Sequence, residues 1–225
     1  NESLGIDVSE MSDLVFMMID LDHFKRVNDA YGHNVGDQLL MGLAARLRNF
    51  VRPGDTVARL GGDEFVILVR LNDDNFDLGR LAQKLLSRVR EPIVTAQHEV
   101  VITASVGITF APEDSLDPGT LLRNADLAMY RAKRSETENT AIFDRTMHEA
   151  AVNRLNLETD LRRAIDRGEF VVYYQPIVSL EDRRIVGFEA LLRWLHPERG
   201  ILAPDAFMAV IQDTGMLATL SWWVL

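Results

Sequence analysis

Three carboxylates in this sequence stand where a folded chain could hold a metal ion. Asp20 ends a run of apolar residues, 14–19, which is typical of a strand buried on both faces. Asp63 and Glu64 follow two glycines between two extended stretches, and glycine accepts the positive φ that a tight hairpin requires. If the hairpin lies beside the first strand, the carboxylates meet at one sheet edge. Such oxygens suit Mg²⁺, which takes its remaining ligands from water and phosphate.

Each of these carboxylates also has a simpler structural explanation. Asp20 could cap the short helix that we expect over residues 24–30. Asp63 and Glu64 could belong to a solvated hairpin tip, because a short motif of this kind is common. The metal interpretation therefore depends on the elements that surround these residues.

Those surrounding elements alternate between helices and strands. Helices are expected over residues 36–50, 77–90 and 118–134, from apolar residues at helical spacing or from terminal signals. Strands are expected over residues 100–110 and 140–143, with Gly107 as a possible bulge. This order predicts an α+β domain over residues 1–143, in which helices flank one mixed sheet, rather than a doubly wound parallel fold.

The composition limits the classes of partner. The chain has 225 residues, no cysteine and a formal net charge of −10, which excludes disulfides and argues against nucleic acid or an anionic membrane as the main partner. No apolar run approaches the ~20 residues of a membrane span, and we find no signal peptide. We expect a cytoplasmic segment of a longer protein, which could itself be tethered to a membrane.

The pattern changes after residue 143. A charged helix over 144–168 is expected to connect to strands over 170–178 and 185–192, followed by helical pieces over 204–213 and 216–225. This part, 169–225, is interpreted as the beginning of a second domain.

Four spaced blocks of residues make the first domain specific. The polar stretch from Asp20 to Asp37, taken with Gly61-Gly62-Asp63-Glu64-Phe65, resembles the GGDEF family of diguanylate cyclases. Arg52 and Asp55 resemble the product-inhibition site of that family, and residues 125–133 resemble its C-terminal helix. The resemblance implies a palm-like fold with a mostly antiparallel sheet. It also implies condensation of two GTP molecules into cyclic di-GMP, with Mg²⁺ or Mn²⁺, in a homodimer.

The resemblance also implies roles for individual residues. The metal ligands would be Asp20, the main-chain carbonyl of Leu21, and Asp63. The catalytic groups would be Asp63, Glu64 and Lys25. The substrate-binding residues would be Asn28, His33, Asp37 and Lys133. Product inhibition would use Arg52 and Asp55.

One departure from the family concerns the segment after Lys133. The family usually continues to Gly-Arg-Asn, whereas this chain has Glu136, Thr137 and Glu138. A phosphate-binding arginine is therefore expected to be missing, which bears on GTP affinity more than on metal binding.

The second part resembles the start of an EAL-type cyclic di-GMP phosphodiesterase, which has a barrel fold. The residues that carry the resemblance are Gln175, Glu189 and Arg193. A β/α barrel needs roughly 250 residues, and only about eighty lie here. We therefore expect these three residues to be vestigial in this chain and expect no phosphodiesterase activity from it.

Three functions remain open from the sequence. The first is an active cyclase with an inhibitory site. The second is a GTP-binding domain that regulates an adjacent phosphodiesterase, which the altered segment after Lys133 favours. The third is a receptor for cyclic di-GMP, which the intact carboxylates oppose.

Overall fold

The computed structural model describes residues 14–71, 77–95, 98–135 and 137–224. The chain forms two compact units, Asn1–His148 and Glu149–Leu225, and each is described by itself. The predictions that concern residues 1–13, Glu136 and Leu225 lie outside the described residues. No helix among the described residues is long and apolar enough to cross a membrane.

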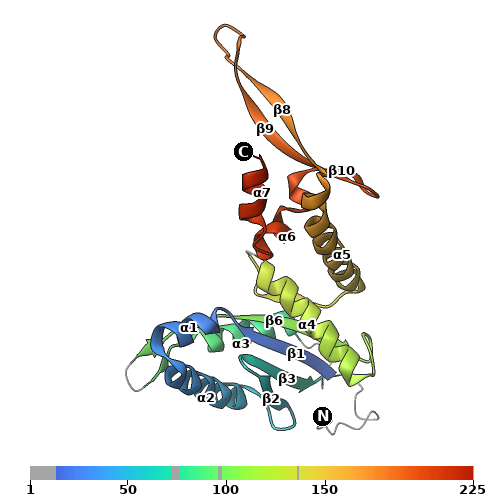
Figure 1. Cartoon of the computed structure of the whole chain (residues 1–225). Coiled ribbons are helices and arrows are strands. Elements are labelled where there is room, and N and C mark those ends of the chain that lie inside the picture. The colour runs from blue at the N-terminus through green and yellow to red at the C-terminus, as the bar shows by residue number, and fades with distance from the viewer. Residues whose placement is uncertain (1–13, 72–76, 96–97, 136, 225) are drawn as a thin grey trace. The chain divides into compact units, whose positions relative to one another are not determined.

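The first unit is built on a five-stranded sheet in the order β2-β3-β1-β6-β7 (Figure 1). Its strands are β1 (Leu14–Leu21), β2 (Thr56–Gly61), β3 (Glu64–Arg70), β6 (Ala104–Ala111) and β7 (Thr140–Ile142). Strand β1 pairs antiparallel with β3 and β6, β2 pairs antiparallel with β3, and β7 is parallel to β6. The mostly antiparallel α+β sheet predicted from the sequence is therefore confirmed.

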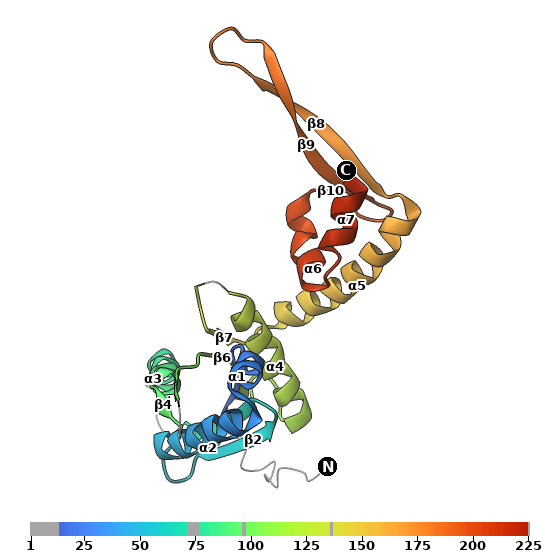
Figure 2. The same ribbon diagram turned by 60° about the vertical axis from the view of Figure 1, so that its left-hand side comes forward.

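Helices cover both faces of this sheet (Figure 2). They are α1 (Phe24–Tyr31), α2 (His33–Phe50), α3 (Leu78–Arg90) and α4 (Pro118–Arg134). Alternate residues of β1 face opposite sides of the sheet. Met17 joins the cluster formed with α2 and α3, whereas Met18 joins the cluster formed with α4. All eight residues of β1 are buried as a result, so its carboxyl end has a fixed position.

The prediction of a bulge at Gly107 is wrong. Gly107 lies opposite Met18 in regular antiparallel register, and its lack of a side chain serves helix packing instead. A Cβ at this position would lie 2.0 Å from the carbonyl oxygen of Ala125 and 2.2 Å from the amide of Met129. Glycine therefore lets α4 approach the sheet closely.

The single strand expected over residues 100–110 is divided. Residues Glu99–Val100 form β5, which pairs with β4 (Ile93–Val94), and β6 begins at Ala104. Between them, the carbonyl of Thr103 accepts a hydrogen bond from the amide of Asp22. This bond ties the residues before β6 to the loop after β1.

The second unit contains a long antiparallel hairpin of β8 (Phe170–Val178) and β9 (Ile185–His196), which is visible in Figure 1. The other elements are β10 (Gly200–Leu202), the 3-10 helix η2 (Pro204–Ala206), α6 (Met208–Asp213) and α7 (Leu217–Val224). Helix α5 (Arg145–Arg167) crosses the boundary between the units, and its Leu157 and Leu161 belong to the core of the second unit.

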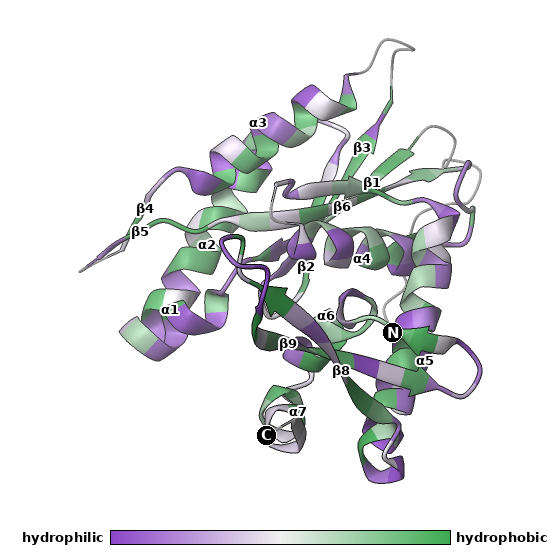
Figure 3. Cartoon of the chain, turned by 90° about the horizontal axis from the view of Figure 1, so that it is seen from above, coloured by the Kyte–Doolittle hydropathy of each residue, from purple (hydrophilic) through white to green (hydrophobic). Residues whose placement is uncertain are grey.

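That second core lies at the base of the hairpin. Trp194 and Phe207 are fully buried there, with ring centroids 5.7 Å apart and perpendicular planes. Strand β9 extends past its expected end at residue 192 because Trp194 and His196 point into this core. Farther along the hairpin, apolar side chains such as Tyr174 and Phe188 are exposed, and Figure 3 shows hydrophobic residues along both strands.

Candidate active site

The sheet of the first unit brings the predicted carboxylates to one edge. Asp20, near the end of β1, lies directly opposite Glu64, the first residue of β3. Asp63 occupies the turn immediately before Glu64. This juxtaposition follows from the antiparallel pairing of β1 with β3, which places the end of one strand beside the beginning of the other.

The turn that carries Asp63 is held by an arginine that the sequence analysis did not identify. Gly62 adopts a φ of +52°, in the left-handed region that favours glycine. The Nε and Nη2 atoms of Arg59 donate hydrogen bonds to the carbonyl oxygen of Gly62, at 2.9 and 2.7 Å. The register of β2 with β3 shifts between Arg59 and Gly61, so the arginine spans the irregular tip and fixes the turn.

Lys133 provides the counterion of the buried carboxylate. Its Nζ donates a hydrogen bond to Oδ1 of Asp20 at 2.6 Å. Burial raises the pKa of Asp20, the hydrogen bond from Lys133 opposes that rise, and the neighbouring charges of Asp63 and Asp22 add to it. Lys133 therefore partly offsets the cost of burying a charge among other carboxylates.

Asp22 is close to this edge but is occupied by other partners. Its two carboxylate oxygens accept hydrogen bonds from the hydroxyls of Thr103 and Ser105, at 2.6 and 2.8 Å. These bonds tie the loop after β1 to the start of β6, so Asp22 has a structural role.

The carboxylates of Glu64 and Asp126 add to the negative charge at this edge. Burial is the main cause that raises the pKa of Glu64, and the nearby charges of Asp126, Asp20 and Asp63 raise it further. Burial also raises the pKa of Asp126, which lies on α4. The sequence analysis included Asp126 only as part of a motif and did not assign it to the site.

The donor set at this edge fits a hard divalent cation. Asp20 and Asp63 offer carboxylate oxygens and Leu21 offers its main-chain carbonyl, which are ligands that Mg²⁺ accepts. Within the described ranges, no group of three or more His, Cys, Asp or Glu side chains could hold a metal ion. A cation here would therefore need further oxygens from water or from a bound phosphate.

The residues expected to hold guanine lie on α1 and α2. His33 and Asp37 are exposed on α2, and their spacing of four places them on one face of the helix. Oδ1 of Asn28, on α1, is buried and has no hydrogen-bond partner in the described part of the chain. A Cβ on Gly36 would lie 1.9 Å from that oxygen, so the glycine is what admits the amide between the two helices.

The region around Lys25 could receive an anion. Lys25 is exposed in the first turn of α1. The N-cap residue of that helix, His23, makes no side-chain hydrogen bond to the helix amides. The amides at a helix N-terminus together with a lysine favour a negatively charged ligand.

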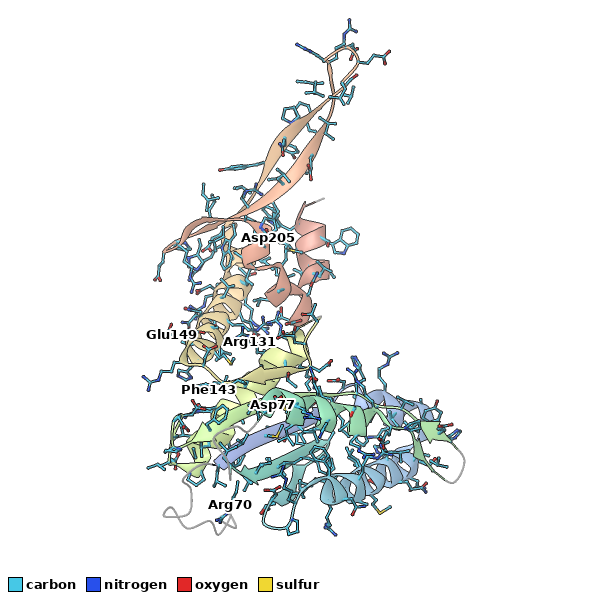
Figure 4. All side chains as sticks on the ribbon, turned by 180° about the vertical axis from the view of Figure 1, so that it is seen from behind. Arg70, Asp77, Arg131, Phe143, Glu149 and Asp205 are labelled. Carbon is cyan, nitrogen blue, oxygen red and sulfur yellow. The ribbon has the colours of Figure 1, made fainter. Side chains whose placement is uncertain are left out.

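Asp55 is engaged by the backbone, and Arg52 is not its ion-pair partner. The carboxylate of Asp55 accepts hydrogen bonds from the amide of Arg52 at 3.0 Å and from the amide of Arg70 at 3.2 Å. Arg70, labelled in Figure 4, ends β3. Asp55 therefore fixes the turn that precedes β2 against β3, while the side chain of Arg52 is exposed.

Helix α4 ends at Arg134, and Ser135 follows as its C-cap residue. The hydroxyl oxygen of Ser135 accepts hydrogen bonds from the amides of Thr137 and Glu138, at 3.3 and 3.0 Å. No arginine stands among the described residues that directly follow Arg134, at 135 and 137–138.

In the second unit, the three residues of the predicted EAL motif lie on the hairpin of β8 and β9. Gln175 and Glu189 are direct cross-strand partners, and both are exposed. Arg193 lies four residues after Glu189 on β9, which places it on the same face. Its Nη1 donates to the carbonyl of Leu192 at 2.7 Å, and its guanidinium lies 5.8 Å from the ring centroid of Tyr173.

The comparisons with known proteins agree with this arrangement. The family model described as "Diguanylate cyclase, GGDEF domain" matches residues 2–139, and the EAL domain model matches residues 158–225. The chain therefore belongs to the GGDEF family, and its GGDEF domain is followed by the start of an EAL domain. These matches support a role in cyclic di-GMP signalling.

Curated relatives are similar to this chain over most of its length and are longer than it. The chain is 44% identical over 209 residues to the bifunctional diguanylate cyclase/cyclic di-GMP phosphodiesterase MucR of Pseudomonas aeruginosa, covering 93% of this chain and 30% of that protein. It is 37% identical over 207 residues to the cyclic di-GMP phosphodiesterase PdeR of Escherichia coli, covering 92% and 31%. The chain thus spans about a third of the length of these relatives.

Solved structures support the fold of the first unit. An EAL/GGDEF domain protein from M. capsulatus is 43% identical, with a TM-score of 0.54 over 58% of this chain and 84% of that chain. The GGDEF domain of PA1120 from Pseudomonas aeruginosa is 37% identical, with a TM-score of 0.53 over 58% and 82%.

Proposed function

We propose that the first unit is a diguanylate cyclase that condenses two GTP molecules into cyclic di-GMP and two pyrophosphates, with Mg²⁺ or Mn²⁺. The observation that carries the proposal is the meeting of Asp20, Asp63 and Glu64 at one sheet edge, with Lys133 among them. A solvated surface turn would not place side by side two carboxylates, Asp20 and Glu64, whose pKa values are raised by burial.

Each half-reaction forms one bond and breaks one. The 3′-oxygen of one GTP bonds to the α-phosphorus of the other, and the bond from that phosphorus to the oxygen bridging to the β-phosphate breaks. The hydroxyl proton passes to Glu64 or Asp63, and pyrophosphate leaves. A raised pKa makes Glu64 a stronger proton acceptor while it is ionised. Two such steps close the ring.

Asp20, Asp63 and the carbonyl of Leu21 would hold the cation in this reaction. A bound Mg²⁺ supplies charge neutralisation and in-line orientation of the triphosphate. Lys25, Lys133 and the first-turn amides of α1 would bind phosphate oxygens, which offsets the repulsion between a triphosphate and an acidic protein.

Guanine would bind between α1 and α2. Its N1–H and N2–H donors match the carboxylate of Asp37, and the amide of Asn28 can both donate and accept. The unpartnered Oδ1 of Asn28 supports this assignment, because a buried acceptor without a partner is costly unless a ligand satisfies it. His33 lies one turn before Asp37 on the same face and would line the same pocket.

The active state would be a homodimer. One unit offers one set of carboxylates and one guanine pocket, whereas the product joins two nucleotides. If the first units of two chains faced each other, each 3′-hydroxyl would lie beside the α-phosphate held by the other chain.

Arg52 and Asp55 would form a product-inhibition site. The guanidinium fork of Arg52 matches the O6 and N7 acceptors of guanine, and the exposure of this side chain supports its availability. Because Asp55 also holds its own turn, Arg52→Ala is the cleaner test. This variant should weaken binding of added cyclic di-GMP and raise the final product yield. Equal inhibition of the wild type and the variant by added product would remove the regulatory role.

A second function has a specific observation in its favour. Residues Thr137 and Glu138 occupy the place where the family usually has an arginine near the phosphates. This supports a GTP-binding domain that is catalytically weak and regulates an adjacent phosphodiesterase.

One experiment separates the two functions. The purified chain is incubated with GTP and Mg²⁺, the nucleotides are separated by chromatography, and GTP affinity is measured in parallel. Formation of cyclic di-GMP that is lost in Asp63→Asn supports the cyclase. Saturable GTP binding without any cyclic di-GMP contradicts the cyclase and supports the regulatory domain.

A further inference from the structure

We propose that Lys133 is an internal substitute for the divalent cation: its ammonium group occupies Asp20 while the site is empty and must leave when the metal binds. The inference rests on the proposed function only in requiring that Asp20 and Asp63 bind a divalent cation. It adds an order of events, in which metal and triphosphate enter together because the triphosphate gives Lys133 another partner.

The contact between Lys133 and Asp20 is the first support. Nζ of Lys133 lies 2.6 Å from Oδ1 of Asp20, so the ammonium already contacts a carboxylate that the cation would need as a ligand. The side chain of Asp20 is 11% exposed, whereas that of Lys133 is 42% exposed. The carboxylate is therefore fixed, and the lysine is free to move into solvent.

The surroundings explain why Asp20 needs a cationic partner. The charges of Asp63 and Asp22 act on Asp20, and those of Asp126, Asp20 and Asp63 act on Glu64. Two hydroxyls already occupy the oxygens of Asp22, but hydroxyls carry no positive charge. The ammonium of Lys133 is the cation that directly contacts Asp20 among the described residues.

The position of Lys133 on α4 allows it to change partners. It lies in the last turn of the helix, which ends at Arg134, where a positive charge interacts favourably with the helix dipole. A lysine side chain is a flexible point charge. It can exchange the Asp20 oxygen for a phosphate oxygen without movement of the helix.

Two consequences follow for metal binding. A free divalent cation must displace Lys133 from Asp20 and then remain near its positive charge, so the affinity for metal alone is low. A triphosphate that arrives with the metal accepts the displaced ammonium, so the two ligands strengthen each other's binding. By linkage, the factor by which nucleotide strengthens metal binding equals the factor by which metal strengthens nucleotide binding.

The test measures Mn²⁺ binding directly, by the electron paramagnetic resonance signal of free Mn²⁺, in the absence of nucleotide. Lys133→Met should bind Mn²⁺ about tenfold or more tightly than the wild type, because it removes a positive charge close to the site. Lys84→Met is the matched control: Lys84 is exposed on α3, and its substitution changes the net charge equally. Lys133→Arg, which keeps the charge, should not tighten binding.

The second arm adds a non-hydrolysable GTP analogue. The analogue should strengthen Mn²⁺ binding by a larger factor in the wild type than in Lys133→Met, because only the wild type has an ammonium to transfer to the phosphates. Circular dichroism checks that each variant is folded, and Lys133→Gln replaces Lys133→Met if the latter is not.

Three results would overturn the inference. They are equal or weaker Mn²⁺ binding by a folded Lys133→Met, equal tightening by Lys84→Met, and no saturable Mn²⁺ binding by any variant. Failure of the cyclase proposal is distinguishable from these results. A chain that shows the expected Mn²⁺ pattern but forms no cyclic di-GMP contradicts the cyclase and leaves the role of Lys133 in place.

Discussion

Strand β1 of the first unit and strand β8 of the second unit are both rich in apolar residues, but their environments differ. All eight residues of β1 are buried between helices on both faces of the sheet. In β8 only Phe170 is buried, and residues from Tyr173 to Val178 are exposed. The same kind of sequence therefore forms a fixed core element in one unit and an uncovered hairpin in the other.

This difference extends to the polar residues that the strands carry. Asp20, 8% exposed at the end of β1, has its ionisation altered by burial and by neighbouring charges. Glu189 and Gln175 face each other on the hairpin and are exposed to solvent. The comparison indicates that burial at a covered sheet edge changes the ionisation of a carboxylate, and that a matching motif on an exposed hairpin does not provide such burial.

The strongest test of the comparison removes one carboxylate from each unit. Asp63→Asn should lower cyclic di-GMP formation by at least about three powers of ten, because a metal-bound carboxylate both neutralises and orients the triphosphate. Glu189→Gln should leave that rate unchanged. Product chromatography checks both variants. Substantial activity in Asp63→Asn, with the fold intact, would contradict the metal assignment.

A smaller effect is expected from Arg59, the arginine that holds the turn carrying Asp63. Arg59→Gln removes two hydrogen bonds to the carbonyl of Gly62, and hydrogen bonds from a charged group contribute ~1.5–3 kcal/mol. The variant should form cyclic di-GMP about tenfold to a hundredfold more slowly, with a smaller change in KM for GTP.

Arg193→Gln in the second unit is the matched control, because Arg193 also donates to a backbone carbonyl. It should leave turnover unchanged. If Arg59→Gln retains full turnover, then Arg59 does not position Asp63.

Substituting one glycine in each unit with alanine compares how closely the two units are packed around a strand. Gly107→Ala should destabilise the first unit by about 3 kcal/mol, because the added methyl would lie 2.0 Å from the carbonyl oxygen of Ala125. At Gly187 on β9, the nearest atom to an added Cβ is Cδ1 of Ile177, at 3.9 Å, which is an ordinary contact. Gly187→Ala should be neutral or slightly stabilising.

Urea unfolding can assign these changes to the correct unit. The three tryptophans, Trp194, Trp222 and Trp223, all lie in the second unit, so their fluorescence follows that unit, whereas far-ultraviolet circular dichroism follows both. Gly107→Ala should shift the circular dichroism transition and leave the fluorescence transition in place. A shift of both by the same amount would mean that the units unfold together.

The smallest expected effect concerns pH and Asp126, measured in EDTA. Burial raises its pKa above the ordinary value of 3.8, so the folded chain keeps this proton to higher pH than the unfolded chain does. The contribution of Asp126 to the free energy of unfolding therefore falls as pH rises from 3.8 through the raised pKa. Asp126→Asn should be slightly more stable than the wild type at neutral pH, and this gain should vanish at low pH.

Asp117 provides a control of opposite sign. The hydroxyl and amide of Thr120 lower the pKa of this carboxyl at the start of α4, so its contribution to stability is present at neutral pH and is lost as pH falls through the lowered pKa. Asp117→Asn should therefore be less stable than the wild type at neutral pH. The same sign for both variants would contradict the burial of Asp126.

The sequence by itself determined the elements and the family. An apolar run predicted β1, helical spacing with Pro118 and basic end residues predicted α4, and two glycines predicted the turn before Glu64. These signals are local, because each depends on residues within one or two turns of the chain. The motif around that turn indicated the GGDEF family.

The tertiary structure alone decided which side chains meet. Lys133 and Asp20 are 113 residues apart in sequence, and no periodicity predicts their contact. Gly107 was expected to form a bulge, but its neighbours across the helix–sheet interface give it a packing role. Local sequence patterns reflect the backbone preferences of neighbouring residues. The burial of a side chain and the charges around it depend on residues that are distant in sequence.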